Sequence, residues 1–171
     1  LSDGSVIGWF QGREEFGQRA LGNRSIIADP RSKKMKDYIN LIIKNRENFR
    51  PFAPSILSEF IDEYFETDSK CKSNYMEKTF KFKNKVLKKI PAVVHIDNTG
   101  RVQTVNKDLS PLYYSLISEF YKMTKIPIVL NTSFNIDGEP IVSSPRDAIR
   151  TFFSSGIDVL VLGKFIVRKK N

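Results

Sequence analysis

The spacing of apolar residues constrains the fold of this chain more than any other feature. It switches repeatedly between the spacing of a strand and that of a helix. Residues 6–10 and 126–130 are short and mostly apolar, as buried strands are. From Ser32 onwards, Met35, Ile39 and Ile43 instead recur at helical spacing, with lysines on the opposite face. Strands and helices that interleave in this way predict an α+β fold, in which helices pack on a mixed sheet.

The same patterns give the order of the expected elements. We expect strands at residues 6–10, 25–28, 55–57, 80–83, 92–96, 101–105, 126–130, 159–162 and 165–167. We expect helices to begin near Ser32, Phe60, Ser110 and Ser144. Residues 97–100 read Asp-Asn-Thr-Gly, which is typical of a hairpin turn, so segments 92–96 and 101–105 are expected to pair as a hairpin.

Composition limits the class of protein. The formal net charge of +9 favours anionic partners, whether nucleic acid, acidic lipid or phosphorylated small molecules. A single histidine, His95, and a single cysteine, Cys71, exclude an intramolecular disulfide and a zinc site built from His and Cys. No apolar segment approaches the roughly 20 residues that span a bilayer. We therefore expect one soluble, cytoplasmic domain over residues 1–171, and its start at Leu1 suggests a fragment of a longer protein.

Residues 11–25 combine three glycines with three arginines directly after the first expected strand. Glycines let the backbone approach a ligand closely, and Arg19 or Arg24 offers the forked donor group that suits a phosphate. The spacing is neither that of a P-loop nor that of a dinucleotide-binding fingerprint. A glycine-rich turn with solvated arginines explains the pattern equally well.

A second cationic stretch follows the lysine-rich helix, where Lys44, Arg46 and Arg50 lie within seven residues of one another. An extended backbone would direct Lys44 and Arg46 to the same side, whereas a helical one would separate them. A solvated helix end, where cations complement the helix dipole, is the alternative interpretation.

Polar residues also follow the apolar strand at 126–130. Asn131, Ser133 and Asn135 come at its carboxyl end, a common position for ligand contacts, although such residues also favour ordinary turns. Arg101, which the expected hairpin places across from His95, is a further candidate anion ligand.

Lysines are also frequent between residues 78 and 89, with Phe80 and Phe82 among them. Lysines interleaved with aromatic residues can form a strip that binds nucleic acid. The exposed face of an edge strand explains them more simply, because lysines there also prevent aggregation.

Taken in order, these stretches resemble one protein family. The segments are 16–30, 44–54, 95–105 and 130–142, and they are similar to the C-terminal domain of the nodulation-type and antibiotic-biosynthesis carbamoyltransferases. The resemblance runs from the first residues to about Lys164. It implies a YrdC-like twisted mixed sheet with flanking helices. The family's Lys-x-Arg and Ser-x-Asn signatures correspond here to Lys44–Arg46 and Ser133–Asn135.

The resemblance also implies a reaction. In that family this domain joins ATP and carbamoyl phosphate into carbamoyl-adenylate and releases pyrophosphate. A metal-bound, Kae1-like N-terminal domain then passes the carbamoyl group to a hydroxyl of a sugar or related acceptor. That domain is not expected within residues 1–171, so this chain by itself would be an incomplete carbamoyltransferase.

Site roles follow as hypotheses. Lys44, Arg46 and Arg50 are the expected catalytic residues, which hold the phosphates and the carbamoyl-phosphate end. The expected nucleotide-binding residues are Arg19, Arg24, Arg101, Asn131, Ser133 and Asn135. Magnesium is expected to accompany ATP, with no metal held by the domain itself, and no membrane partner is expected.

Two competing hypotheses remain. In the first, the domain is an RNA-binding module without catalysis. In the second, it is a scaffold that only docks the N-terminal domain.

Overall fold

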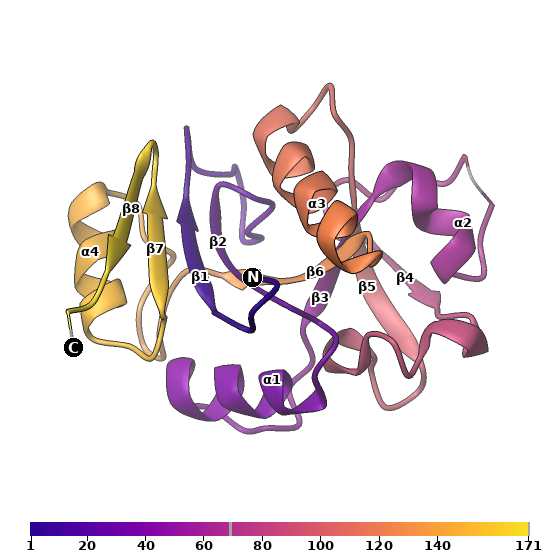
Figure 1. Cartoon of the computed structure of the whole chain (residues 1–171), viewed down its shortest axis with the longest axis horizontal. Coiled ribbons are helices and arrows are strands. Elements are labelled where there is room, and N and C mark those ends of the chain that lie inside the picture. The colour runs from indigo at the N-terminus through magenta and orange to yellow at the C-terminus, as the bar shows by residue number, and fades with distance from the viewer. Residues whose placement is uncertain (69, 171) are drawn as a thin grey trace.

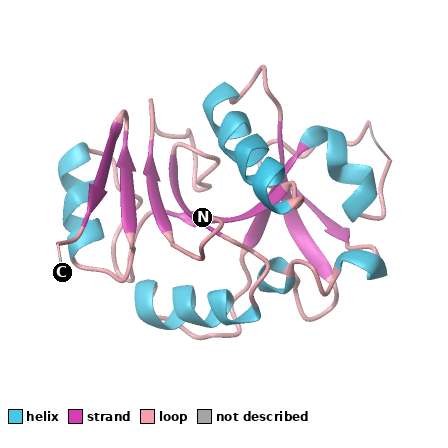
Figure 2. Cartoon of the chain, in the orientation of Figure 1, coloured by secondary structure: helices cyan, strands magenta, loops and turns pink. Residues whose placement is uncertain are grey.

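Strands from the whole length of the chain form one mixed sheet with helices on its flanks (Figures 1 and 2). The computed structural model describes residues 1–68 and 70–170. Within them the strands are β1 Ile7–Phe10, β2 Arg24–Ala28, β3 Ala53–Leu57, β4 Lys78–Lys81, β5 Thr99–Val105, β6 Ile128–Ser133, β7 Val159–Leu162 and β8 Phe165–Arg168. The predicted α+β class is confirmed, and eight of the nine expected strands are present with shifts of a few residues at their ends.

The order of strands across the sheet is β4-β5-β3-β6-β2-β1-β7-β8. Two neighbouring pairs, β3 with β5 and β1 with β7, are parallel, and the other pairs are antiparallel. Segments far apart in sequence therefore lie side by side, and β6 sits between β2 and β3 near the middle of the sheet. This arrangement brings the three loops that follow β1, precede β3 and follow β6 to one region.

All four expected helices are present. They are α1 Lys33–Tyr38, α2 Ile61–Tyr64, α3 Pro111–Thr124 and α4 Pro145–Phe153. A π-helical turn, Ile39–Ile43, continues α1, and a 3-10 turn, Ser58–Phe60, precedes α2. The N-terminus of α4 has the capping box that its sequence predicts, because Ser144 Oγ accepts from the Asp147 amide (3.2 Å) and Asp147 Oδ2 accepts from the Ser144 amide (3.0 Å). None of the helices in the described residues is long and apolar enough to cross a membrane.

The predicted hairpin of 92–96 with 101–105 is wrong. Pro91–Val93 forms a 3-10 turn, and the chain then reverses where the His95 amide donates to Thr99 O (2.9 Å). β4 pairs with Thr99–Val102 and β3 pairs with Gln103–Val105, so each residue of β5 has a strand partner other than segment 92–96. Consequently His95 and Arg101 do not face each other across a hairpin ladder.

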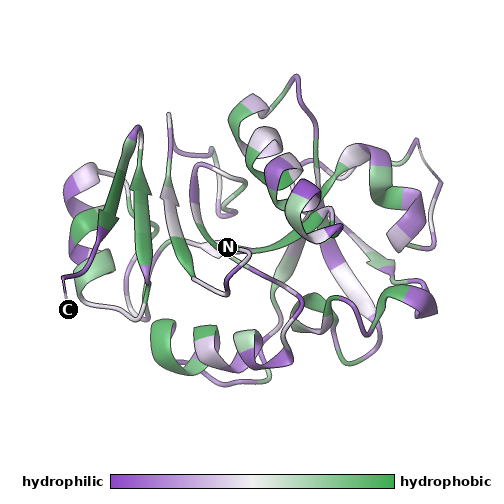
Figure 3. Ribbon diagram, in the orientation of Figure 1, coloured by the Kyte–Doolittle hydropathy of each residue, from purple (hydrophilic) through white to green (hydrophobic). Residues whose placement is uncertain are grey.

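The core lies along the central strands. Every residue of β2 and β3 is buried, as are the first four residues of β6. Figure 3 shows these strands and β7 as mainly hydrophobic ribbon, with hydrophilic residues concentrated in loops and on outer helix faces. Burial on both faces explains why apolar residues are consecutive rather than alternating in these strands, as in Ile26–Ala28 and Ile128–Leu130.

Gly22 joins the loop after β1 to this core. Its φ is +113°, and a Cβ atom there would lie 2.3 Å from Cδ1 of Tyr113, a buried residue of α3. Gly17 has nearly the same φ, +112°, but no atom within 4 Å of the equivalent position. A side chain at either position would therefore incur similar backbone strain, but only one at position 22 would also clash with a neighbour.

We expect Gly22→Ala to lower the free energy of unfolding by about 1–3 kcal/mol more than Gly17→Ala does, because only Gly22→Ala forces α3 away from the loop. Urea denaturation of both variants measures the difference. Equal losses in the two variants would show that Tyr113 does not hold this loop.

Candidate anion-binding site

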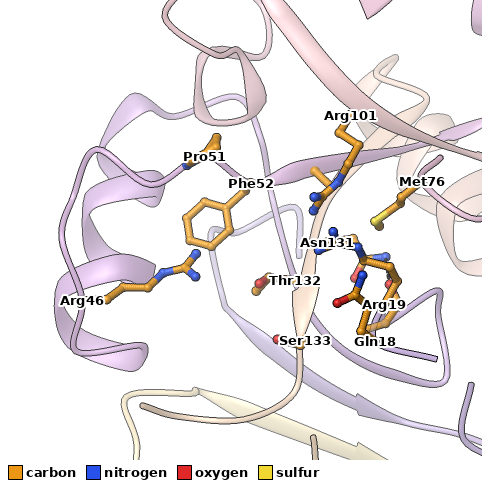
Figure 4. Close-up of a pocket in the computed structure, with 12 residues that line it drawn as sticks. Gln18, Arg19, Arg46, Pro51, Phe52, Met76, Arg101, Asn131, Thr132 and Ser133 are labelled. Atoms are coloured by element: carbon orange, nitrogen blue, oxygen red, sulfur yellow. Dashed lines mark hydrogen bonds between the residues drawn. The ribbon is translucent and has the colours of Figure 1, made fainter. Parts of the chain in front are cut away.

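A hollow of about 130 Å³ opens where five distant segments meet, one of which contributes Met76 (Figure 4). Arg19 comes from the loop after β1, Arg46 from the loop after the π-helical turn, and Arg101 from β5. Asn131 and Ser133 come from the end of β6. In Figure 4 Arg46 and Arg19 lie on opposite sides of Thr132 and Ser133. Five of the nine residues predicted for the site therefore line one hollow.

The hollow exists because β6 is longer than its neighbour. Pairing of β3 with β6 ends at Ala53 opposite Asn131, while β6 continues to Ser133 against β2. One side of Thr132 and Ser133 is thus left without a strand, and both residues are partly exposed there. The polar side chains at the end of this strand are therefore accessible from the hollow.

The charge of this hollow is unbalanced. Three guanidinium groups border it, and no Asp or Glu is among the described residues that line it. Burial lowers the pKa of Arg101, and the neighbouring Arg19 lowers it further. Burial also lowers the pKa of Arg46, and Arg50 adds to that shift. Cations that repel one another in a partly desolvated site are stabilised by a bound anion.

Two buried polar atoms at the hollow also lack a hydrogen-bond partner among the described residues. They are Arg101 Nε, a donor, and Asn131 Oδ1, an acceptor. Buried polar groups are nearly always paired in folded proteins, so the unpaired donor of Arg101 suits an anionic ligand, whereas the Asn131 oxygen needs a donor such as water.

Lys44 lies behind this hollow rather than in it. Its side chain is 4% exposed, and its ammonium group donates to Ser133 O (2.6 Å) and Asn135 O (2.8 Å). It also lies 3.2 Å from Ser133 Oγ and 2.6 Å from Asn135 Oδ1, and Asn135 Oδ1 accepts from Ser133 Oγ as well (2.7 Å). The two predicted signatures, Lys-x-Arg and Ser-x-Asn, are therefore in direct contact, with the lysine fixing the turn that carries Ser133.

A left-handed residue separates the directions of Lys44 and Arg46. Asn45 has φ of 44°, so the backbone here is neither extended nor helical, and both simple alternatives from the sequence fail. Arg46 turns outward, where its Nε donates to Asn40 Oδ1 (2.8 Å) and its guanidinium carbon lies 5.0 Å from the Phe52 ring centroid. Lys44 consequently turns inward and Arg46 faces the hollow.

Asn40 is a functional residue that the sequence analysis missed. It is fully buried, and its amide also donates to the carbonyls of Asn48 (3.2 Å) and Arg50 (3.0 Å). It thereby holds the loop that carries Arg46. The available signal was an asparagine within the apolar stripe of a helix, where a polar residue needs a specific partner.

Arg50 borders a second hollow beside the first. This hollow has a volume of about 390 Å³, and its lining includes Arg46, Arg101, Phe52 and His95 together with Arg50. Arg46, Phe52 and Arg101 also line the first hollow, so the two are adjacent. Arg50 is about half exposed and pairs with Glu47 (3.1 Å). Burial lowers the pKa of His95.

Arg24 is another predicted ligand that the structure places outside the first hollow. It is 4% exposed, stacks on the Phe10 ring at 3.5 Å, and donates through Nη1 to the carbonyls of Gln11 (2.8 Å) and Asn23 (3.0 Å). Its Nη2 donates to Gly12 O (3.1 Å). Its guanidinium therefore orders the start of the glycine-rich loop, and Arg24 does not line the hollow that holds Arg19.

A buried polar network behind the first hollow was also missed. Gln103 Oε1 accepts from Ser55 Oγ (2.6 Å) and Asn131 Nδ2 (3.0 Å), while its Nε2 donates to Leu21 O (2.7 Å). Asn131 Nδ2 also donates to Ala20 O (3.0 Å). The network fastens the loop of Arg19 to β3, β5 and β6.

Glu15 ties the same loop at its outer side. Its Oε1 accepts from the amides of Leu21 (2.6 Å) and Asn23 (2.8 Å). The glycine-rich stretch is therefore an ordered loop rather than a solvated turn. Among residues 1–68 and 70–170, no group of three or more His, Cys, Asp or Glu side chains is placed to hold a metal ion.

Comparison with known proteins identifies the family of this chain. The family model described as "Carbamoyltransferase C-terminus" matches residues 1–169. The chain therefore belongs to the family of carbamoyltransferase C-terminal domains, as its motifs suggested.

Three relatives illustrate the family. Nodulation protein NolO of Bradyrhizobium diazoefficiens is 49% identical over 99% of this chain, and nodulation protein NolNO of Sinorhizobium fredii is 48% identical over 99%. The 3'-hydroxymethylcephem-O-carbamoyltransferase of Amycolatopsis lactamdurans is 35% identical over 95% of this chain. The matches cover 31%, 25% and 30% of those relatives, so the chain spans between a quarter and a third of their length.

Burial of Lys44 makes the stability of the domain depend on pH. Desolvation, assisted by the charge of Arg46, lowers its pKa from 10.5 to about 7. Between these values the unfolded chain binds more protons than the folded one, so Lys44 makes the free energy of unfolding rise with pH from about 7 to about 10.5. We expect Lys44→Met to flatten this rise, and chemical denaturation at several pH values in the window measures it.

The matched control is Lys34→Met, which removes an exposed lysine of α1 and should leave the slope of wild type unchanged. A Lys44→Met profile parallel to that of wild type would mean that the Lys44 ammonium is not desolvated.

Proposed function

We propose that this domain binds ATP and carbamoyl phosphate in the two adjacent hollows and joins them into carbamoyl-adenylate. The observation that carries the proposal is the arginine cluster, Arg19, Arg46 and Arg101, around a hollow without a lining carboxylate. Such a site favours ligands with several negative charges, and forked guanidinium donors suit phosphate groups. Membership of the carbamoyltransferase family supports carbamoyl phosphate as the second substrate.

The size of the hollows supports two anionic ligands. The first, of about 130 Å³, suits phosphate groups rather than a whole nucleotide. The second, of about 390 Å³, shares Arg46 and Arg101 with it and adds Arg50 and His95. We assign the phosphates of ATP to the first hollow and carbamoyl phosphate to the second, so that Arg46 and Arg101 contact both.

The proposed reaction has two steps. Water first releases inorganic phosphate from carbamoyl phosphate and leaves carbamate. A carbamate oxygen then attacks the α-phosphorus of ATP, a new P–O bond forms, and the bond to the β-phosphate breaks to release pyrophosphate. Catalysis here is positioning and charge neutralisation, for which arginines need no pKa near neutrality.

The proposal gives seven of the nine predicted residues a role at the ligands, whereas Arg24 and Asn131 hold the surrounding structure. Arg19, Arg46 and Arg101 neutralise the phosphates, and Arg50 holds the outer end of carbamoyl phosphate. Ser133 contacts a phosphate oxygen, while Lys44 and Asn135 keep Ser133 in place, which makes Lys44 a positioning residue. Magnesium would arrive bound to the phosphates of ATP, as part of the substrate. Transfer of the carbamoyl group to a hydroxyl acceptor is proposed for the remaining length of a protein like the relatives.

We expect Arg101→Ala and Ser133→Ala to weaken ATP binding and to slow pyrophosphate release from ATP plus carbamoyl phosphate. Loss of one charge-assisted hydrogen bond is worth about 1.5–3 kcal/mol, which corresponds to about 10- to 100-fold. Calorimetric titration with ATP and a pyrophosphate-release assay measure the two effects.

The control for this experiment is Lys78→Ala with Lys81→Ala, two exposed lysines on β4. If the domain bound RNA as its main ligand, the two lysine substitutions would reduce the affinity for RNA, and RNA binding would weaken steeply with salt. Ser133→Ala would then leave RNA binding unchanged. That result would contradict the proposal.

A further inference from the structure

A third hollow adjoins the arginine site and differs from it in chemistry. It has a volume of about 270 Å³ and lies between the loop after β1 and residues 74–75, next to β5. Three apolar side chains at this hollow are exposed: Phe16 completely (109%), Tyr75 (64%) and Leu109 (61%). Single exposed apolar residues are common, but three around one hollow indicate a surface that a ligand covers.

Polar groups of this hollow are amides rather than cations. Asn23, Asn74 and Asn106 contribute to the lining, together with the carboxylate of Glu15, whereas the Gln103 amide is already engaged by Ser55, Asn131 and Leu21. Thr104 Oγ1 donates to Asn74 Oδ1 (2.9 Å), which fixes the orientation of that amide. Amide and carboxylate groups pair with the donor and acceptor edge of a nucleobase, and the Glu15 carboxylate disfavours a phosphate.

The same two chain segments border both hollows. Ala20 lines the arginine hollow and Leu21 lines the third one, just as Met76 lines the first and Tyr75 the third. Figure 4 shows Met76 beside Arg19 and Gln18, on the side of the first hollow opposite Arg46. The Gln103 and Asn131 side chains hold the Ala20–Leu21 peptide between the two hollows, through Leu21 O (2.7 Å) and Ala20 O (3.0 Å).

We infer that the third hollow receives the nucleobase of the nucleotide whose phosphates the arginines hold, with Phe16 and Tyr75 as stacking surfaces. The inference rests on the proposed function and adds the subsite that recognises the base. A nucleotide joins an anionic end to a flat aromatic end, and here a cationic hollow adjoins one with exposed aromatic rings. Base–aromatic stacking needs only an exposed ring face, which both residues offer.

The test compares ATP with tripolyphosphate, which has the phosphates but no base. We expect Phe16→Ala and Tyr75→Ala each to weaken binding of ATP to the 171-residue chain by about tenfold and to leave tripolyphosphate binding unchanged. Phe16→Trp should retain ATP affinity, because it keeps an aromatic face. The matched control is Phe165→Ala, which removes a similarly exposed ring (72%) from β8 and should affect neither ligand. Isothermal titration calorimetry measures all of these affinities.

Two outcomes would overturn the inference alone. One is a wild-type chain that binds ATP and tripolyphosphate equally well, and the other is a set of Phe16 and Tyr75 variants that bind ATP as wild type does. Either result would leave the proposed arginine site unaffected. It would mean that the third hollow receives a ligand other than the base, such as the hydroxyl acceptor. A wild-type chain that binds neither ligand would instead overturn the proposed function, and the base subsite with it.

Discussion

The buried ammonium group of Lys44 is the contact on which the site depends. It joins the end of the first helical segment to the end of β6, which lie about 90 residues apart in sequence, through the Ser133 and Asn135 oxygens. Removing a lysine charge from water is costly, so this arrangement persists only because several oxygen atoms replace the lost hydration. The contact sets the position of Ser133, and with the left-handed Asn45 it directs Arg46 to the opposite side. The position of Ser133 relative to the arginines thus depends on the contacts of the buried Lys44.

Repulsion among the arginines is the second constraint. The chain brings Arg19, Arg46 and Arg101 to one hollow without a lining carboxylate, which costs stability in the absence of a ligand. The fold offsets that cost with rigid supports: Asn40 for the loop of Arg46, Glu15 and Gln103 for the loop of Arg19, and Arg24 for the start of that loop. Preorganised charge of this kind is what stabilises an anionic transition state, since little reorganisation is left for the reaction itself.

The sequence predicted the strands and helices well because most of them are buried apolar runs or amphipathic helices, whose patterns are local. It failed for residues 92–96, since their conformation depends on the pairing of β3 and β4 with β5, which no local pattern reveals. The same limit applies to the site. Cations and the Ser-x-Asn turn were identifiable by type, but the inward direction of Lys44 and the structural use of Arg24 depend on partners far away in sequence. Gln103 and Ser55 gave no signal at all, because a buried polar pair between strands has no characteristic spacing.

The central claim is that one anion site forms where Arg19, Arg46, Arg101 and Ser133 meet. The most direct measurement is a crystal structure of the chain with a non-hydrolysable ATP analogue. The account predicts phosphate oxygens within hydrogen-bond distance of Arg19 and Arg101 and beside Ser133, with Lys44 still bound to the Ser133–Asn135 turn. Phosphates bound along the lysines of β4, with the arginine hollow empty, would contradict it.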